Sequence, residues 1–279
     1  MTSSAGALPS VSVITTAYNA APFIEATVAS VLAQRGVEVE HVVVDDGSED
    51  ETLALVRAVD DPRVRVVSAG RVGRGAALNR AVEAATHDYV AVLDADDVAH
   101  PDRLALELGV MRARPDLAAV GTGQVLFSGG EFPDWSTASQ PSQARDIGGE
   151  LLYYNPLSHS SMLFRRTALE RVGRYDERRR ALFDWDLYIR LVSVGYQIAK
   201  LGTPLVAKRI HPGQFFEGRQ TLKYAVACFG LQWRALGRLR RSRLNAPALL
   251  VLLGYRLVPR GVRLALRLTT HRLRSVFGR

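Results

Sequence analysis

The first half of the chain alternates short apolar stretches with stretches of helical periodicity, and this alternation constrains the fold most. The apolar stretches are rich in β-branched residues, which favour strands, and Val42–Val44 is a run of three valines. This alternation predicts an α/β fold, a mainly parallel sheet with flanking helices. The predicted strands are Val11–Thr15, Val39–Val44, Val64–Val67 and Tyr89–Leu93, and the predicted helices are Pro22–Gln34, Glu51–Val59, Ala76–Ala85 and Pro101–Arg114.

The second half continues with a long surface loop, three further strands and one helix. From about residue 215 onwards the pattern is helical only. We therefore expect a flexible N-terminus over residues 1–10, an α/β domain over 11–214 and a helical segment over 215–279. The loop is predicted at Gly129–Gln143, the strands at Ser158–Arg165, Ile198–Val206 and Lys208–Ile210, and the helix at Asp184–Gly195.

The basic residues are concentrated at the C-terminal end. Residues 228–279 hold 12 of the 36 Lys and Arg residues and none of the 28 Asp and Glu residues. Within this segment, Val262–Phe277 places apolar residues on one helical face and arginines on another, which predicts a basic amphipathic helix. We favour an anionic membrane surface as its partner, with a packing helix as the alternative. Nucleic acid is not expected, because the aromatic residues of this segment form no stacking platform with its arginines.

The sequence predicts neither a membrane-spanning helix nor an internal disulfide. Cys228 is the single cysteine, and we interpret it as a small buried apolar residue. The N-terminus lacks the pattern of a signal peptide, and the longest apolar run, Ala248–Val258, is shorter than the roughly 20 residues that cross a bilayer. We therefore expect a cytoplasmic protein that is peripheral at the inner face of the cell membrane.

Polar residues gather where three of the predicted strands end. They are Thr15–Asn19 after the first strand, Asp45–Ser48 after the second and Asp94–Asp97 after the fourth. Ligands of open α/β sheets bind outside the carboxyl ends of the strands. The three clusters therefore predict one shared site.

The carboxylates of these clusters have two interpretations each. Asp94 and Asp96 can hold a hard divalent cation that also engages a diphosphate, or they can form a solvated acidic turn. Asp45 can accept a hydrogen bond from a base or a ribose hydroxyl, or it can serve only the turn at Gly47.

Asp184 lies on the apolar face of its predicted helix, where it shares a stripe with Leu187 and Tyr188. Asp186 lies about 200° away and is expected to form a solvated surface pair with Arg190. An inward carboxylate near a helix start indicates a general base, with helix capping as the alternative.

Two histidines are candidates with an ordinary structural alternative. His159 lies in a predicted strand and His211 in a turn. His211 has the stronger claim to chemistry, because imidazole can fill a position that aspartates leave open on a metal ion.

Several short motifs occur in order between Val11 and Gly213. They are Val13–Asn19, Val44–Ser48, Gly75–Ala81, Leu93–Asp97, His159–Arg165, and Asp184 with Leu187 and Arg190. Together they resemble the motifs of family-2 glycosyltransferases of the GT-A fold. The resemblance implies inverting transfer of a sugar from a nucleotide-diphosphate donor, with a UDP-sugar favoured. It also implies Mn²⁺ or Mg²⁺ as cofactor, a glycan or lipid-linked acceptor, and a role in bacterial surface polysaccharide or glycolipid synthesis.

The resemblance also implies roles for individual residues. Asp184 would be the base, and Asp94 would reach the ribose or the metal region. The metal would be held by Asp96, or by Asp97 in its place, with His211 completing the shell. The remaining contacts would come from Thr16, Tyr18 and Asp45 to the nucleoside, and from His159 to the diphosphate or the acceptor.

One residue departs from the pattern of the family, and three other classes of protein are alternatives to this family. Phe183 occupies the position before the base, where the family usually has Glu, so the acceptor contacts are expected to differ.

A nucleotidyltransferase or a dinucleotide-dependent oxidoreductase would carry a glycine-rich loop after the first strand, and Thr16–Asn19 contains no glycine. The remaining alternative is a non-catalytic membrane-docking or assembly subunit on the same fold.

Overall fold

The computed structural model describes residues 8–128, 135, 142–211, 222–239 and 243–258. The chain divides into two compact units, residues 1–213 and 214–279. The predicted loop Gly129–Gln143 lies almost entirely outside the described residues, and the predicted helix Val262–Phe277 lies wholly outside them.

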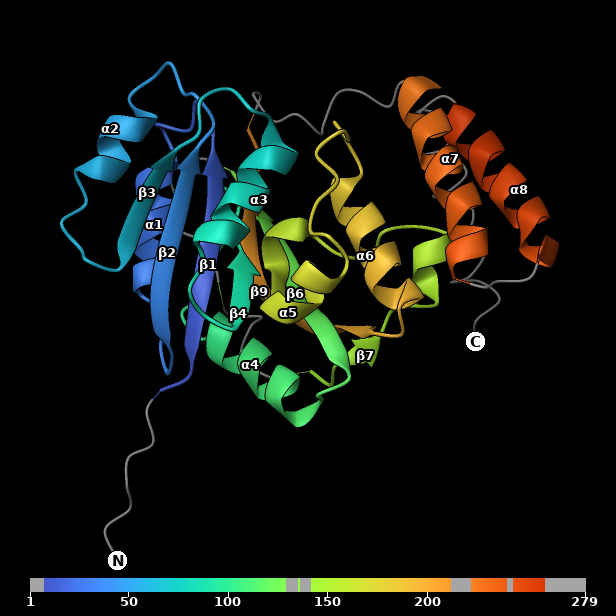
Figure 1. Ribbon diagram of the computed structural model, residues 1–279, viewed down its shortest axis with the longest axis horizontal. Coiled ribbons are helices and arrows are strands. Elements are labelled where there is room, and N and C mark those ends of the chain that lie inside the picture. Colours follow the sequence, from blue (N-terminus) through green and yellow to red (C-terminus); the bar gives the residue numbers. More distant parts are fainter. Residues whose placement is uncertain (1–7, 129–134, 136–141, 212–221, 240–242, 259–279) are drawn as a thin grey trace, which may run out of the picture. The chain divides into compact units, whose positions relative to one another are not determined.

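The first part of unit 1 is a parallel βα array. Its strands run in the order β3-β2-β1-β4 and are all parallel to their neighbours (Figure 1). The predicted alternation is therefore confirmed, with ends shifted by a few residues. The elements are β1 Ser10–Ala17, α1 Ile24–Leu32, β2 Glu38–Asp45, α2 Thr52–Arg57, β3 Val64–Ser68, α3 Arg74–Ala84 and β4 Tyr89–Val92.

The second part of unit 1 extends this sheet with antiparallel and parallel neighbours. β8 joins β4 antiparallel, β6 joins β8 antiparallel, and β9 runs parallel to β6. The sheet of the described residues has nine strands in the order β3-β2-β1-β4-β8-β6-β9-β5, with β7 paired to β9. The added strands are β5 Val98–Ala99, β6 Leu117–Phe127, β7 Arg145–Asp146, β8 Met162–Arg165 and β9 Gln197–Arg209.

The strand predictions for this second part need correction in several places. β6 was not predicted, because its glycines and alanines weaken the β-branched pattern that marks a strand. The two short strands predicted at Ile198–Val206 and Lys208–Ile210 form one strand, β9, since the chain continues through Ala207 without a turn. The predicted strand Ser158–Arg165 begins as a 3₁₀ turn, and only Met162–Arg165 is extended.

Helices cover both faces of the parallel part. α3 packs on β1 and β2 from one side, and α1 lies on the other side (Figure 1). On the α1 side, Val43 packs with Ile24 and Val28 of α1 and with Val56 of α2. The remaining helices of unit 1 are α4 Arg103–Ala113, α5 Arg166–Arg171 and α6 Phe183–Ser193, with 3₁₀ turns η2 Glu150–Leu152 and η3 His159–Ser161.

The described part of unit 2 is helical, as predicted. It consists of α7 Leu222–Arg238, the 3₁₀ turn η4 Arg243–Asn245 and α8 Ala246–Leu257. Cys228 on α7 is buried. None of the described helices combines the length and the apolar character that a membrane span needs.

Candidate active site

The polar clusters after β1, β2 and β4 lie at one edge of the sheet, because these strands are parallel neighbours. The loops after β1 and β2 are bonded to each other. The amide of Asp46 donates to the carbonyl of Ala17 at 2.8 Å, and the amide of Glu49 donates to Oδ1 of Asn19 at 2.8 Å. The structure thus builds the predicted edge from segments that are distant in sequence.

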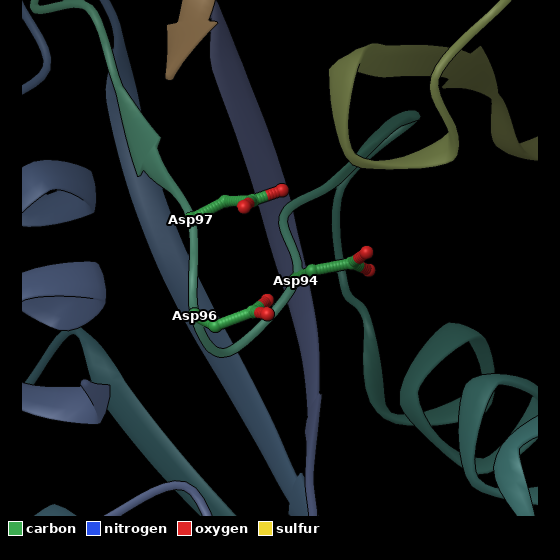
Figure 2. Close-up of side chains that lie close together, drawn as sticks. All are labelled: Asp94, Asp96 and Asp97. Carbon is green, nitrogen blue, oxygen red and sulfur yellow. The ribbon is translucent and has the colours of Figure 1, made fainter. Parts of the chain in front are cut away.

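The turn after β4 presents three carboxylates. Asp94, Asp96 and Asp97 each offer an oxygen, and these oxygens lie within 4.8 Å of one another. The three side chains leave the turn on the same side (Figure 2). The turn is closed by the amide of Asp97, which donates to the carbonyl of Asp94 at 3.1 Å. Carboxylate oxygens at this spacing are the donor set that hard divalent cations prefer.

The backbone of this turn is held from other elements. The hydroxyl of Thr27 on α1 donates toward the carbonyls of Ala95 and Asp97, both at 2.9 Å. The amide of Asp94 donates to the hydroxyl of Ser160 at 3.0 Å, and Nε of Arg209 on β9 donates to the carbonyl of Asp96 at 3.2 Å. The orientation of the carboxylates is therefore set by helix, 3₁₀ turn and strand together.

Asp97 is the deepest of the three carboxylates. Its side chain is 1% exposed; Oδ1 accepts the amide of Arg209 at 3.1 Å, and Oδ2 has no hydrogen-bond partner in the described structure. Burial, followed by the charges of Asp94 and Asp96, raises the pKa of Asp97 to about 8. An orphaned buried oxygen beside two further carboxylates fits a cation, since a cation would supply the missing partner.

His211, near the C-terminal end of unit 1 in the sequence, lies next to this turn. Its Nε2 lies 3.1 Å from Oδ2 of Asp96, although 115 residues separate the two along the chain. Its ring lies 4.5 Å from that of Phe23, centroid to centroid. The two residues predicted to share a metal are thus side by side, and their role as ligands stays a prediction.

Arg74, at the start of α3, was not singled out from the sequence, and it links the acidic turn to Asp184. Its guanidinium pairs with the carboxylate of Asp94 and lies over the ring of Phe183, 5.5 Å from the centroid. The charge of Asp94, and then those of Asp184 and Asp96, raise the pKa of Arg74, whose side chain is 46% exposed. Burial by itself would raise the pKa of Asp94, but Arg74 and other nearby positive groups hold it below its ordinary value. One guanidinium therefore lies among carboxylates from two distant segments.

Asp184 lies in the first turn of α6 and is oriented by Asn155. Nδ2 of Asn155 donates to Oδ2 of Asp184 at 2.9 Å, and Oδ1 of Asn155 accepts the amide of Leu157 at 3.1 Å. α6 begins after Leu182, whose φ is 59°, and no side chain caps it. The capping alternative for Asp184 therefore has no support. Asn155 was also missed, although the Asn155–Pro156 pair is a turn signal.

The expectation for Asp186 was wrong in one respect. It pairs with Arg190 as predicted, at 2.8 Å, but it is 2% exposed rather than solvated. Arg179 also pairs with it, at 3.0 Å. Periodicity placed this position away from the stripe of Asp184, but the guanidinium groups of Arg179 and Arg190 pair with the carboxylate there, and it is buried.

His159 lies between two tyrosines. Its Nδ1 is 2.9 Å from the hydroxyl of Tyr188, and its Nε2 is 3.1 Å from the hydroxyl of Tyr175. Burial lowers its pKa to about 4, although the charges of Asp184 and Asp94 act in the opposite direction. The imidazole is thus neutral and structurally bonded on both nitrogens, and its contact with a ligand stays a prediction.

The residues predicted to contact a nucleoside lie at the ends of β1 and β2. Thr16 is partly buried, and Tyr18 is 40% exposed with the guanidinium of Arg71 3.3 Å from its ring centroid. Asp45 is buried and accepts the amides of Gly47 and Ser48, both at 3.2 Å. Its carboxylate therefore serves the turn, and a contact with donor remains a prediction.

Comparisons with known proteins identify the class of enzyme as a glycosyltransferase. Residues 12–173 match the model of glycosyl transferase family 2. The succinoglycan biosynthesis protein ExoO of Rhizobium meliloti is 50% identical over 98 residues, which are 35% of this chain and 28% of ExoO. The chain thus spans less than a third of that relative.

Two solved structures share the fold. Residues 1–349 of TarS from S. aureus superpose with a TM-score of 0.67 at 18% identity, covering 88% of this chain and 71% of that one. The mannosyltransferase PcManGT from Pyrobaculum calidifontis, in complex with GDP-Man and Mn²⁺, gives a TM-score of 0.65 at 23% identity and covers 96% of this chain and 81% of its own. TarS is also known in complex with UDP and with UDP-GlcNAc.

The chain belongs to glycosyl transferase family 2. The resemblance drawn from the motifs is therefore confirmed, as is the GT-A type of α/β fold.

Proposed function

We propose that this protein transfers a sugar from a nucleotide-diphosphate donor to a hydroxyl of a glycan or lipid-linked acceptor, with inversion at the anomeric carbon. The observation that carries the proposal is the arrangement around Arg74. Its guanidinium pairs with Asp94 and interacts with the charges of Asp184 and Asp96. A carboxylate that could act as the base and the carboxylates that could hold a metal ion thus lie within the electrostatic reach of one guanidinium.

Asp184 accepts the proton of the acceptor hydroxyl as that oxygen bonds to the anomeric carbon. The bond between this carbon and the diphosphate oxygen breaks, and the nucleoside diphosphate leaves. Asn155 engages Oδ2 of Asp184, so we assign proton acceptance to Oδ1. In this proposal Arg74, which pairs with Asp94, stabilises the negative charge that grows on the leaving group, as a preorganised cation does.

The residues that would hold Mn²⁺ or Mg²⁺ are Asp94, Asp96 or Asp97, and His211. When bound, the cation would neutralise charge on the diphosphate. The three carboxylate oxygens within 4.8 Å and the unpartnered Oδ2 of Asp97 support this assignment.

The donor would lie along the ends of β1 and β2, with Thr16, Tyr18 and Asp45 at the nucleoside. TarS in complex with UDP-GlcNAc and PcManGT with GDP-Man support a sugar nucleotide as the donor class. A UDP-sugar is favoured. The naming of ExoO for succinoglycan biosynthesis supports a place in bacterial surface polysaccharide synthesis.

The substitution Asp184→Asn tests the proposal. Loss of a general base lowers turnover about 10²–10⁴-fold, whereas binding of the donor should change little. Turnover would be followed as nucleotide release from UDP-glucose, UDP-GlcNAc and GDP-mannose with Mn²⁺, and binding as protection by UDP against thermal unfolding.

Asp116→Asn is the matched control, because Asp116 is exposed and pairs with Arg114 on the surface. It should leave turnover unchanged. Near-normal turnover in Asp184→Asn would remove Asp184 from its role. If the wild-type chain turned over none of the donors but was still protected by UDP against thermal unfolding, the alternative of a non-catalytic docking subunit would be favoured.

We also propose that unit 2 attaches the protein to the anionic inner face of the cell membrane. On α7, the apolar side chains recur on one stripe that spans about 60° of the helix, and three basic residues flank it. Trp233 in this stripe is 53% exposed, and its ring lies 5.8 Å from that of Phe229. The apolar stripe is Leu222, Val226, Phe229 and Trp233, and the basic flank is Lys223, Arg234 and Arg238.

α8 supports the same partner with a second exposed apolar stripe. Leu250 and Val251 are 56% and 72% exposed, and Leu257 one to two turns later is 51% exposed. Apolar side chains beside Lys and Arg fit a lipid surface, since the chains enter the acyl boundary while the cations meet anionic headgroups.

Vesicle sedimentation tests this attachment with the full chain. Vesicles of phosphatidylcholine with about a third phosphatidylglycerol should bind the wild type in a salt-sensitive manner. The triple variant Trp233→Ser, Leu250→Ser, Val251→Ser should bind several-fold less. These side chains are exposed in the protein and would be buried in the lipid surface, so the variant loses the apolar burial that binding provides. Leu126→Ser on β6, which alters an exposed leucine of unit 1, is the control. Equal binding by the triple variant would reject the surface.

A further inference from the structure

A buried guanidinium lies behind the acidic turn and belongs to none of the groups described so far. Arg103, the first residue of α4, is 1% exposed. Its Nε donates to Oε2 of Glu107 at 3.1 Å. Glu107 is fully buried as well, and its Oε1 has no partner in the part of the chain that the structure describes. Burying an ion pair is costly, so its retention calls for a reason beyond packing.

The other contacts of Arg103 are with strand ends. Its Nη2 donates to the carbonyl of Val92 at 3.1 Å and to that of Met162 at 3.2 Å. Val92 ends β4, and Met162 begins β8. The antiparallel ladder of these strands has its last pair at Ala91 and Leu163. One nitrogen of Arg103 therefore joins the strands where their own hydrogen bonds stop.

These strand ends lead directly into the acidic turn. Val92 precedes Asp94 by two residues, and Met162 follows Ser160 by two. The hydroxyl of Ser160 accepts the amide of Asp94 at 3.0 Å. A shift of either strand end would therefore move the backbone that carries Asp94 and, beyond it, Asp96.

We propose that Arg103 is a positioning residue for the divalent cation of this site, acting through the backbone of β4 and β8, and that Glu107 orients its guanidinium. This inference rests on the proposed function, because it takes Asp94, Asp96 and Asp97 as the cation's ligands. Outer groups that orient ligands typically contribute 10–100-fold to metal affinity. Arg103 contacts neither the cation nor substrate.

The test compares Mn²⁺ affinity with stability in the full chain. Binding of Mn²⁺ alone, and again with UDP present, would be measured by the loss of the free Mn²⁺ signal in electron paramagnetic resonance. The variant is Arg103→Met with Glu107→Leu, which removes both charges and keeps the volume of the core. Apolar replacements of a buried ion pair are often neutral for stability. This variant also leaves the carbonyls of Val92 and Met162 without the donor Nη2, so we expect cooperative unfolding at a reduced stability.

We expect its Mn²⁺ affinity to fall about 10–100-fold. Glu107→Gln keeps an oxygen for Nε of Arg103 and should bind Mn²⁺ nearly as the wild type does. Met111→Leu, a volume-conserving change at a fully buried position of the same helix, is the control and should not alter affinity.

A folded double variant that binds Mn²⁺ as tightly as the wild type would overturn the inference. If the double variant does not fold, Arg103→Lys is decisive: it keeps the charge but not the planar fork, so its affinity should fall while its fold is kept. Wild-type affinity in Arg103→Lys would then overturn the inference. Absence of Mn²⁺ binding by the wild type would be a different failure, that of the proposed metal site itself.

Discussion

At the scale of single residues, the site depends on neutral groups that orient charged ones. Asn155 is the clearest case. The amide of Leu157 donates to its Oδ1, which directs Nδ2 toward Asp184. The carboxylate of Asp184 thereby has Oδ2 engaged by Asn155, and Oδ1 is the oxygen to which we assign the proposed proton transfer. A base oriented in this way spends less time in unproductive rotamers.

Asn155→Ala should lower kcat about tenfold, which corresponds to the roughly 1.4 kcal/mol of one hydrogen bond to a charged group. The KM for the donor should change little, because the lost contact serves the base. Steady-state kinetics with a UDP-sugar donor would measure both. A large rise in donor KM with unchanged kcat would show that Asn155 serves donor binding instead.

At the scale of elements, the β6–β9 pair depends on close approach of two backbones. A Cβ added to Gly123 of β6 would lie 2.6 Å from the carbonyl oxygen of Gly202 and 3.1 Å from that of Thr203. The register of the two strands shifts on both sides of Gly123. Glycine is thus needed at this bulge for space.

Gly123→Ala should destabilise the protein by about 1–3 kcal/mol, since the backbone of β9 must move. Gly109→Ala is its matched control, because Gly109 lies inside α4 with nothing within 4 Å of an added Cβ. That change should stabilise by about 0.5–1 kcal/mol, because alanine favours a helix interior over glycine. Urea unfolding would measure both, and a shift of the same sign in the two variants would contradict the argument.

At the scale of the whole molecule, two buried neutral histidines tie stability to pH. His41 on β2 is fully buried, and burial lowers its pKa to about 3. The hydroxyl of Thr15 donates to the carbonyl of Leu93 and must accept from Nε2 of His41. Nδ1 of His41 thus carries no proton and has no described partner. His159, with a pKa of about 4, is the second such group.

The two histidines should therefore contribute a fall in the free energy of unfolding as the pH drops from about 6.5 toward 4, whereas Asp97 and Glu107, whose pKa values burial raises to about 8 and about 7, contribute a slope of the opposite sign. Over this range the unfolded chain binds a proton on each histidine, while the folded chain binds few until the pH approaches about 4 and about 3. Each histidine contributes a slope of up to about 1.4 kcal/mol per pH unit. Urea unfolding at several pH values measures the slope of each protein, and the slope of His41→Gln should be less positive than that of the wild type, because only the contribution of His41 is removed. The same slope in wild type and variant would contradict the assignment to His41.

The sequence alone determined the parallel βα half of the fold and the identity of the acidic turn. Both are local properties. Strand and helix periodicities depend only on contiguous residues, and so does the Asp94–Ala95–Asp96 turn. The motifs were also sufficient for the family, which the comparison with family models confirms.

The tertiary structure decided which distant groups meet. It placed His211 beside Asp96, which is 115 residues away in the sequence, and Arg74 among carboxylates from two segments. It also placed Asn155 where its amide donates a hydrogen bond to Asp184. It also buried Asp186 and assembled β6 despite its glycines. These outcomes depend on the path of the chain through space, and periodicity along one segment carries no information about what another segment brings to it.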